Sequence, residues 1–572
     1  MKRLLCIFTT ICLIISMAAG FSGCGEKKDD GIPFFSADKS NFLLIRSEKA
    51  DSATIEAAKY FRQAIIDTHN ITMEYKTDSV AVNKDKYEVN IGVTNRPKAK
   101  KIYDEILSAN KNNAKDFSIV KDGKIIYIVG STDYALKDAV VYFLSHYCAY
   151  NTSTVPTTLE YKFHFDISKS NLSLAGEKDI SKFKVVIPKY NMSYVVGREV
   201  DTLLQQIVEA TGILVEKVTD NTKESECEIV IGETKRGNAP LPSNTDEFII
   251  EAKGKKLYVN GATDLCTAIA IKDLGKMITE EKAIDSNFNY TGSYSYSKKS
   301  YDDPLYSLTW SDEFDTLDTN IWTIEKGVVN NKKINGKDIA FSGDEKNVKV
   351  EDGKLIMRAD YNDKAYEGAE IRTSKSVWYK YGLAEISFKY NNTDGLVSAF
   401  WTLGLHGASE VSGEIDVFES YALRNKLRCT SLAHAEEYSH FSSDIEYGSL
   451  QPSEKEVKDM NSDFYKKVFH ELPDGDTFDD DWHTIGAEWD ESSIRWVLDG
   501  QVILEIDTTA NERARLAFND NMQFILTQYS ANNVFPKIQK DVSENTDWKN
   551  NHFTVDYLRL YQLPGQQLSK YY

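Results

Sequence analysis

Cysteines are few in this chain, and their spacing argues against a metal or redox centre. Only seven occur among 572 residues, and no two form a C-x-x-C pair, the spacing typical of zinc and redox sites. A phosphate-binding loop, a Ser–His–Asp arrangement and a dinucleotide fingerprint are also missing from the sequence, so these chemistries are not indicated. Cys227 and Cys266 lie in one unit and could form a disulfide, with four unpaired buried cysteines as the alternative.

Positive charge is also in short supply. The chain has 68 Lys and Arg against 87 Asp and Glu, a formal net charge of −19. Such an acidic surface argues against nucleic acids and other anionic polymers as partners, because both need cationic surfaces. A neutral glycan is compatible with this charge. Aromatic residues make up 12% of the chain, which fits β-sheet cores and sugar stacking equally well, and the core is the default interpretation.

Long apolar segments are missing except at the start of the chain. Lys2 and Arg3 precede an apolar run over 4–19, which is too short for a comfortable membrane span and is typical of a signal peptide. The segment Phe-Ser-Gly-Cys at 21–24 resembles a bacterial lipobox. We therefore expect a signal peptide over 1–23, lipidation of Cys24, a tether over 24–35, and a lipoprotein on the outer face of a bacterial membrane. Secretion after ordinary signal cleavage is the alternative.

One acidic segment stands out, Glu-Ile-Asp-Val-Phe-Glu at 414–419. Side chains alternate between the two faces of a strand, so Glu414 and Asp416 share a face and Glu419 points away from it. A β-bulge at Val417 or Phe418 would return Glu419 to the face of the other two acids. The two glutamate Cα atoms would then lie about 13 Å apart, and inward-leaning side chains would bring their carboxyls to the roughly 5–5.5 Å that a retaining glycosidase needs.

This spacing predicts a division of roles among the three acids. Glu414 would attack the anomeric carbon, and Glu419 would protonate the leaving oxygen and later deprotonate a water. Asp416 would hydrogen-bond the nucleophile and separate the titrations of its neighbours. No cofactor is needed for this mechanism. The alternative interpretation is a solvated strand face whose charges bind a metal or nothing.

The surrounding sequence resembles glycoside hydrolase family 16. The family signature, Glu-x-Asp-x-(x)-Glu, occurs here in the longer, bulged form that resembles the laminarinase branch. Further segments resemble the family in chain order, at 310–314, 317–318, 322, 368–373, 381–385, 481–484, 488–489, 494–496, 499–500 and 555–561. The resemblance spans 305–563 and implies an all-β jelly-roll sandwich over about 304–564, with its cleft on the concave face. We expect Trp310, Trp322, Trp489 and Trp496 to fill the core.

The resemblance also implies substrate contacts. Glu370 and Arg372 match positions that hydrogen-bond sugar hydroxyls, with a buried ion pair as the alternative. We expect Trp378 and Trp401 to stack on pyranose faces, and His434 matches a position beside the catalytic strand. A structural calcium is held by many family members, and Glu313 and Asp556 would be its oxygen ligands here.

An internal repeat precedes this domain. Residues 87–96 match 227–236, and 116–133 match 247–264. Both copies read as β-α-β-β-β-α, which predicts two α+β domains at 36–167 and 183–296 and a multidomain protein overall. The pattern resembles the small domain that precedes the catalytic barrel of β-hexosaminidases and α-glucuronidases. The copies would either bind glycan or act as a spacer.

These features predict a retaining endo-β-glycanase that acts on β-1,3- or mixed β-1,3/1,4-glucan. Two segments depart from the laminarinase pattern: 396–401 reads Leu-Val-Ser-Ala-Phe-Trp and 530–536 reads Ser-Ala-Asn-Asn-Val-Phe-Pro, and each replaces a tryptophan that would line a glucan cleft. An endo-β-galactanase or host-glycan hydrolase is therefore the alternative enzyme, and a non-catalytic glycan-binding protein is the alternative class. We expect a monomer that binds polysaccharide and, through its anchor, a membrane.

Overall fold

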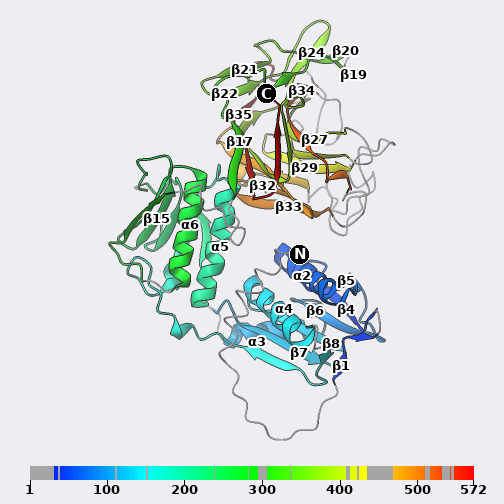
Figure 1. The fold of residues 1–572 in the computed structure, drawn as a ribbon, viewed down its shortest axis with the longest axis vertical. Helices are drawn as coiled ribbons and strands as arrows, with labels where there is room; N and C mark the ends of the chain where they lie inside the picture. The colour runs from blue at the N-terminus through cyan, green and yellow to red at the C-terminus, as the bar shows by residue number, and fades with distance from the viewer. Residues whose placement is uncertain are drawn as a thin grey trace.

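The protein folds into two α+β units and one β-sandwich (Figure 1). The computed structural model describes residues 31–571 except for 37–38, 110–112, 150–152, 238, 281–282, 294–305, 335, 394, 407–411, 421–423, 434–467, 509–515, 531–541 and 543–545. The expected signal peptide and Cys24 lie outside this part of the chain. Within it, none of the helices has the length and apolar content needed to cross a membrane. Its four cysteines are buried free thiols, at Cys148, Cys227, Cys266 and Cys429.

The first α+β unit is a six-stranded sheet with helices on both faces. The strand order is β5-β4-β6-β8-β7-β10, where β4, β5, β6 and β8 are parallel to one another. Side chains alternate along β8, so Ile126 and Ile128 pack with α2 and α4 while Ile125 and Tyr127 pack with α3. The elements are β4 Phe42–Arg46, α2 Ser52–His69, β5 Tyr75–Thr77, β6 Tyr87–Ile91, α3 Ala99–Ala109, β7 Phe117–Asp122, β8 Ile125–Gly130, α4 Asp133–Tyr147 and β10 Glu160–Phe163.

The second α+β unit has the same strand order. Its sheet runs β12-β11-β13-β15-β14-β16, which corresponds strand for strand to the first. A buried ion pair also recurs, since Arg96 binds Glu88 in one unit and Arg236 binds Glu228 in the other. The helix α3 has no counterpart among the described residues that link β13 to β14. The elements are β11 Lys184–Ile187, α5 Tyr194–Thr211, β12 Glu216–Thr219, β13 Glu228–Ile231, β14 Glu247–Lys253, β15 Lys256–Gly261, α6 Asp264–Thr279 and β16 Asn289–Ser293.

The C-terminal part is a sandwich of two sheets that are antiparallel except for the parallel pair β20–β24. The outer sheet has the order β21-β22-β35-β26-β31-β32-β33, with β17 on β35. Trp310, Trp322, Trp489 and Trp496 lie in the core between the sheets, as predicted. The strands of the outer sheet are β17 Ser307–Asp312, β21 Val348–Glu351, β22 Lys354–Met357, β26 Gly382–Asn391, β31 His483–Trp489, β32 Ser493–Leu498, β33 Gln501–Asp507 and β35 His552–Gln562.

The second sheet of the sandwich carries the acidic segment. Its order is β19-β20-β24-β34-β27-β28-β29-β30, with β18 and β23 on β24 and the β25–β36 pair joined to β34. The acidic segment forms β28, which is flanked by its sequence neighbours β27 and β29, while β34 from a later part of the chain lies beyond β27. The strands are β18 Thr323–Ile324, β19 Gly327–Ile334, β20 Lys337–Phe341, β23 Asp360–Tyr361, β24 Ala365–Arg372, β25 Val377–Lys380, β27 Leu396–Gly404, β28 Gly413–Glu419, β29 Lys426–Ala433, β30 Phe469–Glu471, β34 Met522–Ser530 and β36 Gln567–Lys570.

Short elements connect these bodies. Two small two-stranded ladders join β1 to β9 and β2 to β3. Two single turns of 3-10 helix lie between β10 and β11, and a third precedes β31. These elements are β1 Ile32–Pro33, β2 Phe35–Ser36, β3 Lys39–Ser40, β9 Thr154–Val155, η2 Ile167–Lys169, η3 Ile180–Lys182 and η4 Pro473–Gly475.

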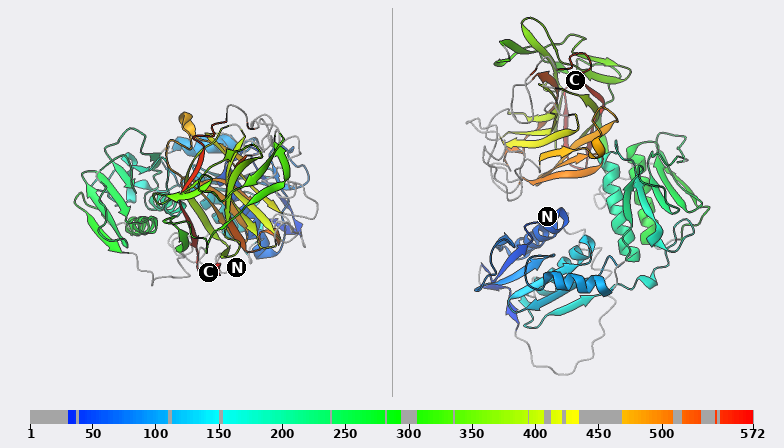
Figure 2. Two further views of the ribbon diagram at one scale, coloured as in Figure 1. Left: turned by 90° about the horizontal axis from the view of Figure 1, so that it is seen from above. Right: turned by 180° about the vertical axis from the view of Figure 1, so that it is seen from behind.

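The second α+β unit packs against the outer sheet of the sandwich (Figures 1 and 2). The two bodies share one apolar cluster, in which Leu383 and Val497 of the sandwich lie among residues of α5 and α6. The backbone N–H of Tyr194, the first residue of α5, donates to Oε2 of Glu385 at 2.9 Å. A carboxylate at a helix N-terminus satisfies an N–H group that has no partner in its own helix. The two bodies are therefore joined by apolar packing and by a buried cap.

Glu385 makes this junction sensitive to pH. The side chain is 1% exposed, and burial raises the pKa of Glu385 from 4.5 to about 7, with the Tyr194 N–H opposing the shift. A raised carboxyl pKa means that its stabilising contribution is complete below about pH 4.5 and is lost as pH rises through about 7, by at most about 3 kcal/mol. We expect the stability of wild type relative to Glu385→Gln to fall between pH 5 and pH 8. Urea unfolding of both proteins at these pH values measures the difference, and parallel curves would contradict it.

Candidate active site

A β-bulge in β28 brings the three acids of the acidic segment to one face. Phe418 pairs with Phe400 of β27, and Asp416 pairs with the next residue, Trp401. Val417 therefore has no partner on β27 and is the extra residue. The predicted bulge is confirmed at one of its two expected positions.

Burial agrees with the register. Ile415, Val417 and Phe418 are fully buried members of the sandwich core, whereas Glu414 and Glu419 are partly exposed. Two consecutive residues, Val417 and Phe418, thus face the core, which no regular strand allows. The acids occupy the opposite face of the sheet, as the predicted roles require.

Asp416 lies between the two glutamates and is 7% exposed. Burial, and then the negative charges of Glu414 and Glu419, hold the pKa of Asp416 well above its ordinary value. The hydroxyl of Thr430 donates a hydrogen bond of 2.8 Å to Asp416 Oδ2. Asp416 therefore retains its proton to higher pH than an ordinary carboxyl, and a protonated acid can donate a hydrogen bond to a neighbouring carboxylate.

Glu419 has a cationic neighbour that sequence analysis missed. Arg428 faces it across the β28–β29 pair, and Arg428 Nη1 donates to Glu419 Oε2 at 2.8 Å. Both side chains are largely buried, at 8% and 15% exposure. A buried guanidinium favours the ionised carboxylate. Glu414 is opposite Leu432 in the same pair of strands.

Trp401, Glu370 and Arg372 are connected to the acids by one network. Trp401 is directly opposite Asp416, and its indole N–H donates to Thr527 Oγ1 at 2.9 Å. The Thr527 hydroxyl in turn donates to Glu370 Oε2 at 3.3 Å, and Arg372 binds the same carboxylate. The sheet therefore brings three predicted substrate residues to the face that carries the acids.

Glu370 is the most enclosed member of this network. It is 4% exposed, and burial raises its pKa while Arg372 opposes the rise. Arg372 Nε also binds Glu325 at 3.1 Å. Glu370 and Arg372 thus form an ion pair beside Thr527 in which Glu370 is buried and Arg372 is partly exposed. The pair can still orient groups that contact a sugar.

Tyr529 is a second residue that sequence analysis missed. It lies on β34, two residues from Thr527. Burial raises its pKa, and the charges of four carboxylates add to this effect, those of Glu419, Asp416, Glu370 and Glu414. The Tyr529 phenol therefore lies within electrostatic range of all four acids. Its proton is held firmly, so the hydroxyl can serve as a hydrogen-bond donor at this face.

Trp378 is a predicted substrate residue for which the described residues show no contact with the acids. Trp378 is 8% exposed on β25, and its indole N–H donates to the carbonyl of Ser374 at 3.0 Å. Among the described residues, the partners of β25 are β34 and β36, at some distance along the sheet from β28. His434 lies outside the described residues.

The residues expected to hold calcium, Glu313 and Asp556, each pair with a cationic side chain in this structure. Glu313 accepts two hydrogen bonds from Arg559, of 3.0 and 2.9 Å, and Asp556 accepts one from Lys354 at 2.8 Å. In the described part of the chain, no group of three or more His, Cys, Asp and Glu side chains is placed to hold a metal ion. Each carboxylate is thus paired with its own cation, and calcium at this position remains a prediction.

Comparisons with known proteins agree with the resemblance noted from the sequence. Residues 307–563 match the family model for the GH16 domain of β-porphyranases A–D, a little under half of the chain. The chain is 28% identical over 221 residues to glucan endo-1,3-β-glucosidase A1 of Niallia circulans, covering 35% of this chain and 29% of that protein. It is 26% identical over 270 residues to glucan endo-1,3-β-glucosidase of Cryptopygus antarcticus, covering 44% and 90%.

Solved structures cover a similar share of the chain. The laminarinase catalytic domain from Thermotoga maritima MSB8 is 25% identical, covers 45% of this chain and 98% of its own, and has a TM-score of 0.35. The chain spans less than a third of the length of the Niallia circulans protein. The comparisons therefore concern the C-terminal sandwich and support a glycoside hydrolase family 16 domain there.

Proposed function

We propose that residues 307–563, a glycoside hydrolase family 16 domain, hydrolyse internal β-1,3 linkages of glucan with retention of anomeric configuration. The single observation that carries the proposal is the bulge at Val417, which gathers Glu414, Asp416 and Glu419 on one face. A protein that only binds glycan has no need of three crowded carboxylates, because crowding costs electrostatic free energy. The names of two curated relatives, both glucan endo-1,3-β-glucosidases, support the choice of substrate.

The first chemical step forms a covalent intermediate. The Glu414 carboxylate attacks the anomeric carbon while Glu419 transfers its proton to the departing glycosidic oxygen. The C–O bond to the leaving sugar breaks, and an ester to Glu414 forms on the opposite face of the ring. Asp416, which retains its proton because of burial and its two acidic neighbours, donates a hydrogen bond that orients Glu414 for attack.

The second step returns the enzyme to its starting state. Glu419, now ionised, removes a proton from water, and the water oxygen attacks the anomeric carbon and releases Glu414. Esterification has removed the negative charge of Glu414, so the electrostatic repulsion between the two glutamates is gone. Arg428, bound to Glu419, then favours the ionised form that acts as the base. One arginine thereby assists the change of role between the two steps.

Arg428 sets the pH dependence in this scheme. Replacing it by Met removes the cation beside Glu419, which then keeps its proton to higher pH. We expect the alkaline limb of the kcat/KM profile to move up by about one pH unit. The same variant should slow the second step, because the base forms less readily. Arg428→Lys keeps the charge and should lie near wild type. Coincident profiles for wild type and Arg428→Met would contradict the assigned role.

The main alternative is another β-linked glycan, because the matching family model is named for β-porphyranases. The endo-β-galactanase or host-glycan hydrolase predicted from the altered 396–401 and 530–536 segments belongs to this class. Reducing-sugar release from laminarin, lichenan, galactan, mucin and porphyran would separate the candidates. Release from laminarin supports the glucanase. Release from another polymer alone would replace it, and release from none would favour a binding protein.

Several finer assignments belong to the same proposal. We propose a signal peptide over 1–23, a tether over 24–35 with lipidation at Cys24, α+β domains over 36–167 and 183–296, and a catalytic domain over 304–564. The protein would be a monomer on the outer face of a bacterial membrane, or else secreted. Metabolic labelling with palmitate, with Cys24→Ala as the control, tests the anchor. Retention of residues 32–300 on insoluble glycans tests binding against a spacer role for the α+β domains.

A further inference from the structure

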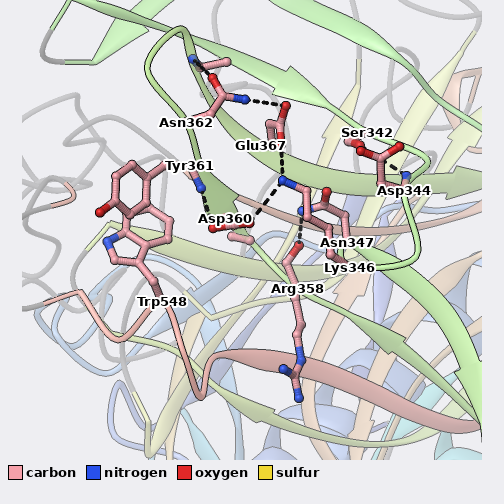
Figure 3. Close-up of polar contacts among 12 residues, drawn as sticks. Ser342, Asp344, Lys346, Asn347, Arg358, Asp360, Tyr361, Asn362, Glu367 and Trp548 are labelled. Atoms are coloured by element: carbon pink, nitrogen blue, oxygen red, sulfur yellow. Dashed lines mark hydrogen bonds and ion pairs between the residues drawn. The ribbon is translucent and has the colours of Figure 1, made fainter.

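A cluster of three aromatic rings, of which Tyr361 is exposed, Trp548 is partly buried and Tyr366 is buried, lies at the end of β24 away from Arg372. Tyr361 is 49% exposed, and its ring centroid is 5.0 Å from that of Trp548 at an interplanar angle of 51°. Trp548 is stacked on Tyr366 at 5.7 Å and 15°. Figure 3 shows Tyr361 and Trp548 side by side. We call these three residues the aromatic platform.

An ordered set of polar side chains borders the aromatic platform. Lys346 Nζ binds Asp360 at 3.1 Å and Glu367 at 2.7 Å, and Asn362 Nδ2 donates to Glu367 at 2.7 Å (Figure 3). These contacts hold the side chains in one geometry, at a cost in rotamer entropy. The carboxylate, amide and ammonium groups are therefore in position before a ligand binds. Such groups pair well with adjacent hydroxyls.

A second lysine, Lys337, lies over the rings of Tyr361 and Tyr366. Lys337 Nζ is 5.0 Å from the Tyr361 ring centroid and donates to the Asn362 carbonyl at 2.6 Å. The ammonium covers part of one ring face, and the rest of Tyr361 stays exposed to solvent. An aromatic ring in water, next to fixed polar groups, fits a ligand that is apolar on one face and hydroxylated at its edge.

The aromatic platform and the network around the acids both include residues of β24. Tyr361 pairs with Tyr366 at the start of β24, and Glu370, which belongs to the network around the acids, lies four residues further along that strand. Four residues of strand span about 13 Å. A polymer bound beside Glu370 therefore has only a short distance to cover to reach the platform.

We propose that the aromatic platform is an accessory binding site for polysaccharide. The C–H face of a β-linked pyranose packs on Tyr361 and Trp548, and its hydroxyls hydrogen-bond to Asp360, Asn362 or Lys346. The site holds a chain segment remote from the bond that is cut. It therefore improves binding of long chains and leaves short oligosaccharides unaffected. The identity of the ligand as a β-glucan rests on the proposed function; the binding itself does not.

The test compares Tyr361→Ala with two controls, because Tyr361 is exposed and its removal should leave the fold intact. Tyr361→Phe keeps the ring, and Tyr571→Ala removes a tyrosine that is more exposed, at 69%, and lies beside Ser376. We expect Tyr361→Ala to weaken retardation in laminarin-containing native gels by about tenfold in apparent Kd, with both controls near wild type. Hydrolysis of a short laminari-oligosaccharide should be unchanged. Equal retardation of Tyr361→Ala and wild type would overturn the proposal.

Gels cast with lichenan, galactan and porphyran separate this proposal from the catalytic one. If wild type is retarded in a gel of any one glycan and Tyr361→Ala is not, the platform is supported. This holds even where wild type fails to hydrolyse that glycan. Hydrolysis of laminarin by wild type without retardation in any gel would support the catalytic assignment and refute the platform. Circular dichroism of each variant verifies folding before the gels are interpreted.

Discussion

Replacing Glu414 by Gln is expected to reduce release of reducing sugar by a factor on the order of 10⁴ or more. The amide is nearly isosteric but cannot attack the anomeric carbon, so the first step has no nucleophile. The loss should appear in kcat, since the groups that contact the rest of the sugar chain are unchanged. Binding of glycan in native gels should persist, which separates a catalytic defect from misfolding. Initial rates on laminarin measure the effect.

The two glutamates can be told apart by chemical rescue. In Glu419→Ala the nucleophile remains, and azide can occupy the space of the missing base and attack the intermediate, giving a product of retained configuration. In Glu414→Ala azide takes the place of the nucleophile itself and gives the inverted product. Product analysis by NMR should therefore show opposite anomers for the two variants. Rescue with the same anomer in both, or full activity of Glu414→Gln, would remove the assigned roles.

The acid cluster could be predicted because its evidence is local. Strand alternation and one inserted residue, Val417, decide where Glu414, Asp416 and Glu419 point, and all of these lie within one hexapeptide. The core tryptophans were predictable for a related reason, since large apolar residues in a sandwich pack between its sheets.

The neighbours of the acids could not be predicted in the same way. Arg428 meets Glu419 only through the register of β28 with β29, and a shift of one residue would turn it to the other face. Tyr529 reaches the carboxylates from a strand more than a hundred residues away. No periodicity in the sequence encodes either pairing. The cationic partners of Glu313 and Asp556 could not be predicted for a similar reason, because Arg559 and Lys354 reach them from elsewhere in the fold.

Helix α3 was missed although a signal for it exists. Pro97 precedes it, and Ile102 and Ile106 are its buried residues at helical spacing, a pattern typical of an amphipathic helix after an N-terminal proline. The second copy of the repeat has no counterpart of α3 among its described residues, so an alignment of the two copies does not reveal this helix. The packing of the second α+β unit against the sandwich was not predicted either. It depends on the shapes of two surfaces, and neither surface has a sequence motif.

That packing leads to the second large effect. A Cβ atom on Gly197 of α5 would lie 2.1 Å from the carbonyl oxygen of Gly500, in the turn between β32 and β33. Nearby, the Asn191 N–H donates to Asp499 at 2.8 Å, and the Thr484 hydroxyl donates to the Met192 carbonyl at 2.7 Å. Glycine is therefore required at 197 because the backbones of the two bodies touch there, and not because of its own dihedral angles.

Gly197→Val is expected to lower the melting temperature by on the order of 5–10 °C. A side chain at this point must push backbone aside and separate α5 from the outer sheet, which costs about 3 kcal/mol. Helix propensity acts in the opposite direction, because valine is a better helix former than glycine. Thr202→Val, on the exposed side of the same helix, is the matched control and should have the same melting temperature as wild type. Calorimetry on the full chain measures both.

The same variant tests whether the α+β unit supports the catalytic strand. Val497 of β32 belongs to the shared interface cluster, and its neighbour Trp496 donates from its indole N–H to the backbone carbonyl of Asp416 at 2.9 Å. Separation of the interface should therefore loosen the strand that carries the acids. We expect Gly197→Val to lose hydrolytic activity at the temperature where its interface melts, below that of wild type. Full activity retained above that melting transition would show that the sandwich holds its acids without help from the second α+β unit.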